Sequence, residues 1–222
     1  VAARYDDDNG DYAGAVYVFR ESAGTYAQVA KLTASDAATN DYFGYSVAID
    51  GNTIVVGAYY KSSGTGAVYV FRTSDGGATY DEVAKLTASD AASGDYFGRS
   101  VAIDGNTVVV GAYYDDGGGS SSGSVYIFHT SDGGATYDEV AKLTASDAAS
   151  YDYFGYSVAI AGGTVVVSAY RDDDDGSSSG SVYIFHTSDG GATYAQVAKL
   201  TARAAAADDV FGASVAIDGD TI

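Results

Sequence analysis

Apolar and polar positions follow a pattern along this chain that returns four times. In the stretch from Asp41 to Tyr60, DYFGYSVAIDGNTIVVGAYY, residues 45–49 and 53–59 are apolar nearly throughout and are separated by the short turn 50–52. Two such runs joined by a turn of this kind predict a tight β-hairpin, and the lack of alternation predicts strands that are covered on both faces. We expect them to be the inner strands of a sheet.

Two further strands are predicted after this hairpin. Residues 66–72 carry apolar side chains on both faces, whereas residues 81–88 alternate as a half-exposed outer strand does. The segment 73–80 between them, TSDGGATY, has the composition of a turn. Only the Ala-rich segment 202–209 departs from this all-β pattern, so each unit predicts four antiparallel strands.

The unit repeats with a nearly constant length. Its Phe-Gly pair begins at Phe43, Phe97, Phe154 and Phe211, so that the copies are 54, 57 and 57 residues apart. A period of this size filled with strands is typical of a stacked or radial all-β array. The units cover 41–94, 95–151 and 152–208, with a split unit made of 209–222 and 1–40.

These units resemble the FG-GAP repeat of integrin-α-like β-propellers. The resemblance rests on Phe43-Gly44, on Gly57-Ala58 after the second strand and on the third strand GAVYVF, and it covers essentially all four units. It implies an all-β fold, a β-propeller with four-stranded antiparallel blades. We expect the phenylalanine of each Phe-Gly pair to fill the space between blades.

A second resemblance concerns the turn after the third strand. The turn 73–80 is similar to the Asp box of sialidase-type propellers, and it recurs at 130–137 and 187–194. We expect its aspartate, Asp75 in the first copy, to accept hydrogen bonds from backbone N–H groups of its own turn. This turn is therefore predicted to be structural.

The two ends of the chain complement each other. Residues 1–20 match the second half of the unit, and residues 214–222 match its first half. This predicts one propeller domain over residues 1–222 whose ring is closed by strands from both termini. The alternatives are two chains that form an eight-bladed ring and a longer array of blades.

Charge narrows the range of partners. The chain has 30 acidic and 11 basic residues and a formal net charge of -19, which repels phosphate backbones and anionic membranes. No apolar run reaches the roughly 18 residues that a membrane span requires. We therefore expect neither nucleic-acid binding nor membrane insertion. Cysteine is absent, which excludes disulfides and thiolate chemistry.

Acidic and tyrosine residues concentrate in loops that a propeller places on one face. These loops join the second strand to the third and one blade to the next. A solvated surface is the simpler interpretation of such loops. The alternative is a binding face on which phenol rings stack on a glycan or anchor a protein ligand. The candidate residues of this face are Asp41, Tyr42, Asp95, Tyr96, Asp152, Tyr153, Tyr59, Tyr60, Tyr113 and Tyr114.

Calcium is the one cofactor that the acidic loops suggest, and the sequence does not establish it. The turn that holds calcium in FG-GAP proteins is shortened here to Asp50-Gly51-Asn52, which cannot surround an ion. Carboxylates in the loop between the second and third strands remain as metal candidates, although Lys61 replaces them in the second unit. The candidate metal ligands are Asp6, Asp8, Asp115, Asp116, Asp172 and Asp174.

No catalytic site is predicted. His129 and His186 stand at the repeat position that Arg20 and Arg72 occupy in other units, which favours a surface role. The chain contains neither a Gly-x-Ser-x-Gly nucleophile elbow nor a phosphate-binding Gly loop.

The sequence predicts a non-enzymatic recognition or adhesion module that binds a protein or a glycan, and the FG-GAP resemblance implies an extracellular or cell-surface location. The alternative is a structural building block of a surface assembly or filament, which includes homo-oligomers. A sialidase-like enzyme is the weakest interpretation, because the arginines do not gather at one repeat position beyond Arg20 with Arg72.

Overall fold

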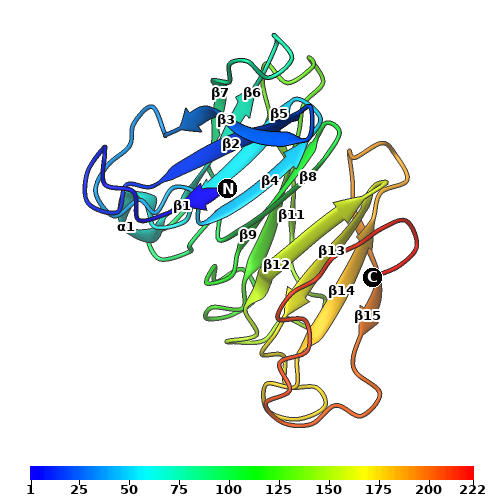
Figure 1. Ribbon diagram of the computed structural model, residues 1–222. Coiled ribbons are helices and arrows are strands. Elements are labelled where there is room, and N and C mark those ends of the chain that lie inside the picture. Colours follow the sequence, from blue (N-terminus) through cyan, green and yellow to red (C-terminus); the bar gives the residue numbers. More distant parts are fainter.

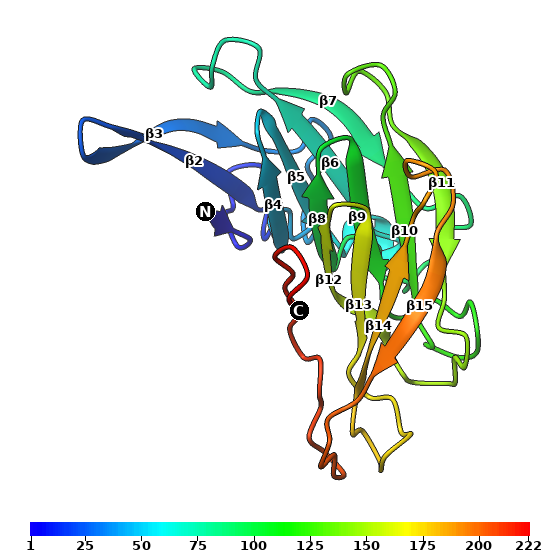
Figure 2. The ribbon, with the colours of Figure 1, turned by 90° about the vertical axis from the view of Figure 1, so that its right-hand side faces the viewer.

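The computed structural model describes residues 1–222 and contains four successive antiparallel sheets (Figures 1 and 2). Three sheets have four strands in the orders β4-β5-β6-β7, β8-β9-β10-β11 and β12-β13-β14-β15, and the first has three in the order β1-β2-β3. The one helical segment is the short turn α1, Lys61–Gly64. No helix of the chain has the length and apolarity to cross a membrane. The predicted all-β fold of propeller blades is confirmed.

The strands of each blade follow one another along the chain. The first blade contains β1 (Ala2–Ala3), β2 (Ala15–Ser22) and β3 (Thr25–Leu32). The second contains β4 (Ser46–Asp50), β5 (Thr53–Ala58), β6 (Ala67–Arg72) and β7 (Asp81–Leu86). The third contains β8 (Ser100–Asp104), β9 (Thr107–Ala112), β10 (Ser124–His129) and β11 (Asp138–Leu143). The fourth contains β12 (Phe154–Ala161), β13 (Thr164–Ala169), β14 (Ser181–His186) and β15 (Ala195–Leu200).

The hairpin predicted at the centre of the repeat unit forms as β4 and β5. Asp50 pairs with Thr53, so that Gly51 and Asn52 alone make the turn. Gly51 has a φ of 52°, the left-handed conformation that such turns require. Every residue of β5 is buried, as its continuous apolar sequence predicts, whereas β7 alternates between exposed and partly buried positions along most of its length.

Apolar side chains fill the spaces between neighbouring blades. Phe43 has no exposed surface, and its ring packs edge-on against Tyr69 and Phe71, with centroids 5.6 and 5.9 Å away. The same cluster includes Val16 from the first blade and Ile54 from the second. Burying a Phe side chain in this way contributes roughly 1.5–3 kcal/mol. The expected role of the Phe-Gly phenylalanine between blades is confirmed.

The backbones of adjacent blades approach each other closely at a glycine. A Cβ atom on Gly57 would lie 2.0 Å from the carbonyl oxygen of Gly98, a distance that no side chain tolerates. The hydroxyl of Ser46 donates to the same oxygen at 2.7 Å. Gly57, next to the last residue of β5, therefore allows the inner strands of adjacent blades to approach each other closely.

The predicted closure of the ring by strands from both termini is not confirmed. β1 pairs only with β2, and the segment 209–222 pairs with no strand of the first blade. Phe211, Val215 and Ile217 pack instead against the fourth blade, next to Val166 and Val182. In Figure 1 the C-terminal segment, drawn in red, runs beside β13 and β14. The four blades therefore form an open arc, because the apolar side chains of this segment are already covered by the blade that precedes them.

Candidate functional site

Tyrosine side chains from all four blades form one continuous chain of ring contacts, which we call the tyrosine ribbon. Neighbouring rings have centroids 4.3–6.0 Å apart, the range of stacked and edge-to-face pairs. Tyr96 lies near its middle, stacked on Tyr60 at 6.0 Å and edge-on to Tyr114 at 5.1 Å. The members are Tyr5, Tyr12, Tyr42, Tyr45, Tyr59, Tyr60, Tyr96, Tyr113, Tyr114, Tyr153, Tyr156 and Tyr170.

The tyrosine before each of the first three Phe-Gly pairs enters the ribbon through an unusual backbone conformation. Tyr42, Tyr96 and Tyr153 have φ angles of 53°, 57° and 58°. Left-handed conformations of this kind cost a non-glycine residue roughly 1–2 kcal/mol. Backbone hydrogen bonds hold them in place, for example from Tyr96 N–H to the Gly64 carbonyl at 2.8 Å. The fold therefore accepts local strain in order to place these rings.

The tyrosines that follow the second strand of each blade complete the ribbon. Tyr59 and Tyr60 lie beyond β5, and Tyr113 and Tyr114 lie beyond β9. All of the tyrosines that we selected from the sequence are brought together here. The sequence reasoning did not select the ribbon members in the position after Phe-Gly, such as Tyr45, although the repeat places them beside the others.

The predicted aspartates of the binding face lie behind the rings. Asp41 and Asp152 are 4 % exposed, and each accepts a hydrogen bond from a backbone N–H of its own loop. Asp95 is partly buried and bonds its loop in the same way. These carboxylates shape the loops that carry the tyrosines, and Asp41 and Asp152 present little surface to a ligand.

Burial raises the pKa of two of these carboxyl groups, Asp152 and Asp95. It raises the pKa of Asp152 to about 6, and the nearby Asp172 and Asp173 add to this through charge repulsion. Burial also raises the pKa of Asp95. The ribbon is therefore backed by carboxyl groups that take up protons more readily than exposed ones.

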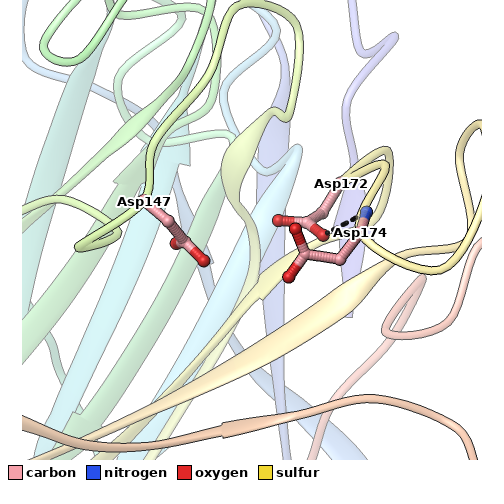
Figure 3. Close-up of side chains that lie close together, drawn as sticks. All are labelled: Asp147, Asp172 and Asp174. Atoms are coloured by element: carbon pink, nitrogen blue, oxygen red, sulfur yellow. Dashed lines mark hydrogen bonds between the residues drawn. The ribbon is translucent and has the colours of Figure 1, made fainter.

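The predicted metal ligands in the fourth blade form a cluster with a lysine at its centre. Asp172 and Asp174 face Asp147, and one oxygen of each lies within 4.8 Å of the others (Figure 3). The backbone N–H of Asp174 also donates to Asp172 at 3.2 Å. Lys199 Nζ lies 2.7 Å from Asp147 Oδ2 and 3.0 Å from Asp172 Oδ2, and it contacts Asp174. A cation would have to displace this ammonium group.

The same arrangement recurs at other metal candidates. In the first blade Lys31 contacts both Asp6 and Asp8. In the third, Lys142 lies 3.0 Å from Asp115, whose carboxylate also accepts a hydrogen bond from the Tyr126 hydroxyl. The sequence reasoning missed these lysines, although the segment AKLTA that contains them recurs in every unit.

Asp116 is the exception among the metal candidates. It makes no ion pair, and its carboxylate accepts a hydrogen bond from the backbone N–H of Ser121 at 2.7 Å. Asp116 therefore orders its own loop and lies outside the lysine-centred clusters.

The turns that resemble the Asp box are held together by their aspartates. Asp75 accepts hydrogen bonds from the backbone N–H groups of Ala78 and Thr79 and from the hydroxyls of Thr73 and Thr79. The bonds from Thr79 and Thr73 hold its pKa well below the usual range. The expected structural role of this aspartate is confirmed, and the resemblance to the Asp box stays a prediction.

The surface near the ribbon is hollowed at the first blade. A hollow of about 230 Å³ is lined by Arg4 and by four ribbon members, Tyr5, Tyr42, Tyr45 and Tyr59. A larger hollow of about 530 Å³ lies away from the ribbon, between β2 and β4, and its lining is entirely apolar or aromatic. It borders Val16, Val47 and Ile49. This hollow lies beside the first blade, which has three strands where the other blades have four.

Comparisons with known proteins agree with the repeat pattern. A family model described as the FG-GAP repeat matches the chain four times, at residues 26–71, 80–128, 137–185 and 194–222. No curated protein matches the chain significantly. The crystal structure of Saccharomyces cerevisiae Sqt1 is similar with a TM-score of 0.47 and 11% sequence identity, over 73% of this chain and 36% of that one. A likeness at this level carries no argument about function.

Proposed function

Since this chain belongs to the FG-GAP repeat family, we propose that it is a non-enzymatic recognition module that binds a glycan or a protein ligand across the tyrosine ribbon. The continuity of the ribbon over four blades is the observation that carries this proposal. Phenol rings offer large, rigid contact area with little loss of side-chain entropy, which suits them to recognition surfaces.

The cost of building the ribbon supports a role beyond packing. Tyr42, Tyr96 and Tyr153 are strained, yet their rings do not enter the apolar clusters between the blades. Tyr60 remains 39 % exposed and Tyr12 46 % exposed. Residues with strained backbone cluster at ligand-binding and active sites. The arrangement therefore favours a surface that meets a ligand.

The chemistry of the same surface argues against catalysis. Within the ribbon, no histidine or nucleophile–base pair accompanies the tyrosines, and the nearby carboxylates are bound by lysines or by their own loops. His129 and His186 bond the Thr107 and Thr164 hydroxyls at the ends of β10 and β14. We therefore infer an adhesion-type role, and the typical setting of FG-GAP repeats supports an extracellular location.

A second candidate function follows from the unpaired edge of β1. Its backbone groups face no other strand on one side, and apolar residues such as Val16 and Ile49 line the hollow beside it. This favours a building block in a longer array of blades, because an exposed edge is a template for strand addition. Mass photometry of the chain tests this candidate.

The experiment that tests the ribbon proposal is an array of glycans and proteins probed with matched variants. Tyr60→Ala and Tyr114→Ala remove ribbon rings, whereas Tyr26→Ala removes a ring that is 75 % exposed on β3 and lies outside the ribbon. We expect the first two variants to lose ligands that the third retains. Equal binding by all three would contradict the proposal.

A further inference from the structure

The two kinds of basic side chain are used differently in this molecule. Every lysine makes an ion pair with an aspartate, and no arginine makes one. The guanidinium groups of Arg4, Arg99 and Arg171 also make no hydrogen bond to a carboxylate, although the chain carries a net charge of -19. Unpaired guanidinium groups in such an acidic protein require an explanation.

All three arginines stand at repeat positions that hold tyrosine in other units. Arg4 matches Tyr59 and Tyr113, the first residue after the second strand. Arg99 matches Tyr45 and Tyr156, directly after Phe-Gly. Arg171 matches Tyr60 and Tyr114, the second residue after the second strand. Three different ribbon positions have therefore received a guanidinium group, each in a different blade.

The three guanidinium groups lie against ribbon rings. Arg99 Cζ is 4.4 Å from the centroid of Tyr45, 4.6 Å from that of Tyr156 and 5.6 Å from that of Tyr113, so it bridges successive blades. The equivalent atom of Arg4 is 4.7 Å from the Tyr5 centroid. These are cation–π distances, and such contacts hold the planar group while leaving its edge donors unused.

Arg171 completes the row at its far end. Its Cζ lies 5.3 Å from the Tyr153 centroid and 5.5 Å from that of Tyr170. At the opposite end, Arg4 lines the hollow of about 230 Å³ with Tyr5, Tyr42, Tyr45 and Tyr59. The ribbon therefore offers three guanidinium groups, each with paired N–H donors, between flat tyrosine rings.

No carboxylate near the ribbon forms an ion pair with these arginines. Asp6, which borders the neighbouring hollow beside Arg4, is held by Lys31 and by the Tyr17 hydroxyl. Asp152 is buried behind its loop, and Asp172 is paired with Lys199. Lys31 and Lys199 hold Asp6 and Asp172, and Asp173 accepts a hydrogen bond from the backbone N–H of Ser178 in its own loop. The arginines therefore keep their donors for a group that comes from outside.

We propose that the tyrosine ribbon binds an acidic saccharide, whose rings stack on the tyrosines and whose carboxylate or sulfate groups bind Arg4, Arg99 and Arg171. Guanidinium groups form paired hydrogen bonds with both kinds of anion, and these bonds are the strong ones in recognition. The inference rests on the proposed function, because it names the ligand class of the same surface.

The test compares matched saccharides on the intact chain at low salt. The probes are tetragalacturonate, its methyl ester, which has the same rings without the charges, and a sulfated carrageenan tetrasaccharide, and binding is measured by calorimetry. We expect at least one acidic probe to bind, about tenfold or more tightly than the methyl ester, and to weaken as salt rises. The acid that binds identifies the anionic group.

Variants separate the charges from the fold. Arg4→Gln, Arg99→Gln and Arg171→Gln should each weaken the acidic probe about tenfold, whereas Arg203→Gln, an exposed arginine outside the ribbon, should not. Arg99→Lys keeps the positive charge but loses the paired N–H donors of the guanidinium group, so it should lose most of the affinity. Near-UV circular dichroism checks that the variants fold.

Two results overturn the inference. One is equal binding of the methyl ester and the acid, with no effect of the arginine variants, and the other is no binding of either acid. In both cases the proposed function still stands if a ligand found on the array no longer binds Tyr60→Ala but still binds Tyr26→Ala. The failure of this inference can therefore be told apart from the failure of the proposed function.

Discussion

Lys61 Nζ lies 2.7 Å from Asp41 Oδ2, and both side chains are less than 10 % exposed. The third and fourth units have an aspartate in place of Lys61, so that Asp95 is accompanied by Asp115 and Asp152 by Asp172. The second blade therefore contains a buried ion pair at this position. The third and fourth blades contain two carboxylates there, one of which pairs with a lysine of the outer strand, Lys142 or Lys199. This difference makes the pair a sensitive point of the fold.

Removing the lysine of this pair should destabilise the protein strongly. Lys61→Met leaves the buried carboxylate of Asp41 without a counter-charge, which we expect to cost about 3 kcal/mol of unfolding free energy. The double variant Lys61→Met/Asp41→Asn should recover much of this. Urea unfolding measures both, with Lys85→Met, from a more exposed pair, expected to cost less than about 1 kcal/mol. A single variant as stable as the wild type would contradict the account.

Asp152 should make stability depend on pH. Because its pKa is raised to about 6, the folded protein binds more protons than the unfolded chain between about pH 4 and pH 6. Its contribution therefore becomes less favourable as pH rises through this window. Asp152→Asn removes the charge and keeps an oxygen acceptor for Ala149 N–H, so it should raise the melting temperature at pH 7 and bring no gain near pH 4.

The control for this prediction is the equivalent residue in the last unit. Asp209 bonds its own loop in the same way but is exposed. Asp209→Asn should therefore not raise the melting temperature at pH 7. If Asp152→Asn raised the melting temperature equally at all pH values, the gain would not come from burial of the ionised carboxyl group.

Calcium should not stabilise the wild-type protein, because lysines occupy the carboxylate clusters. In Lys199→Met the carboxylates of Asp147, Asp172 and Asp174 lose their shared counter-ion. We expect a lower melting temperature for this variant without calcium and a partial recovery at millimolar calcium, since a hard cation can take the place of the ammonium group. A calcium-dependent rise in the wild type would mean that the lysines do not block the clusters.

Val210 occupies the repeat position of Tyr42 and has a φ of 48°. A β-branched residue in this conformation is strained without offering a ring to the ribbon. Val210→Gly should therefore stabilise the protein, by about 1 kcal/mol in denaturant unfolding. Ala213→Gly, which relieves no left-handed strain, should not stabilise it. Destabilisation by Val210→Gly would indicate that its packing outweighs the strain.

The strands and the apolar contacts between blades were predictable from the sequence because local patterns determine them. The run 53–59 predicted a buried strand, and all of β5 (Thr53–Ala58) is buried; likewise Phe43 was expected between blades and is fully buried there. Repetition made these predictions stronger, since the same residue types recur at the same spacing.

The candidate site was only partly predictable, since it depends on contacts between distant residues. The tyrosines were selected correctly as a face, but the pairing of Lys199 with three aspartates joins β15 to two loops that lie 25 to 52 residues away. Ring closure by the termini was not confirmed for a similar reason. The ends of the chain match in sequence, yet Val215 and Ile217 find apolar partners in the nearer blade.

Chemical footprinting of tyrosines tests the central claim most directly. The chain has 21 tyrosines and no tryptophan or cysteine, so nitration followed by mass spectrometry reports almost only on them. With a saturating ligand from the array, we predict protection of the exposed ribbon members Tyr12 and Tyr60 and unchanged nitration of the exposed Tyr26. Protection of Tyr26 with unchanged nitration of Tyr12 and Tyr60 would show that the ligand binds elsewhere and would contradict the account.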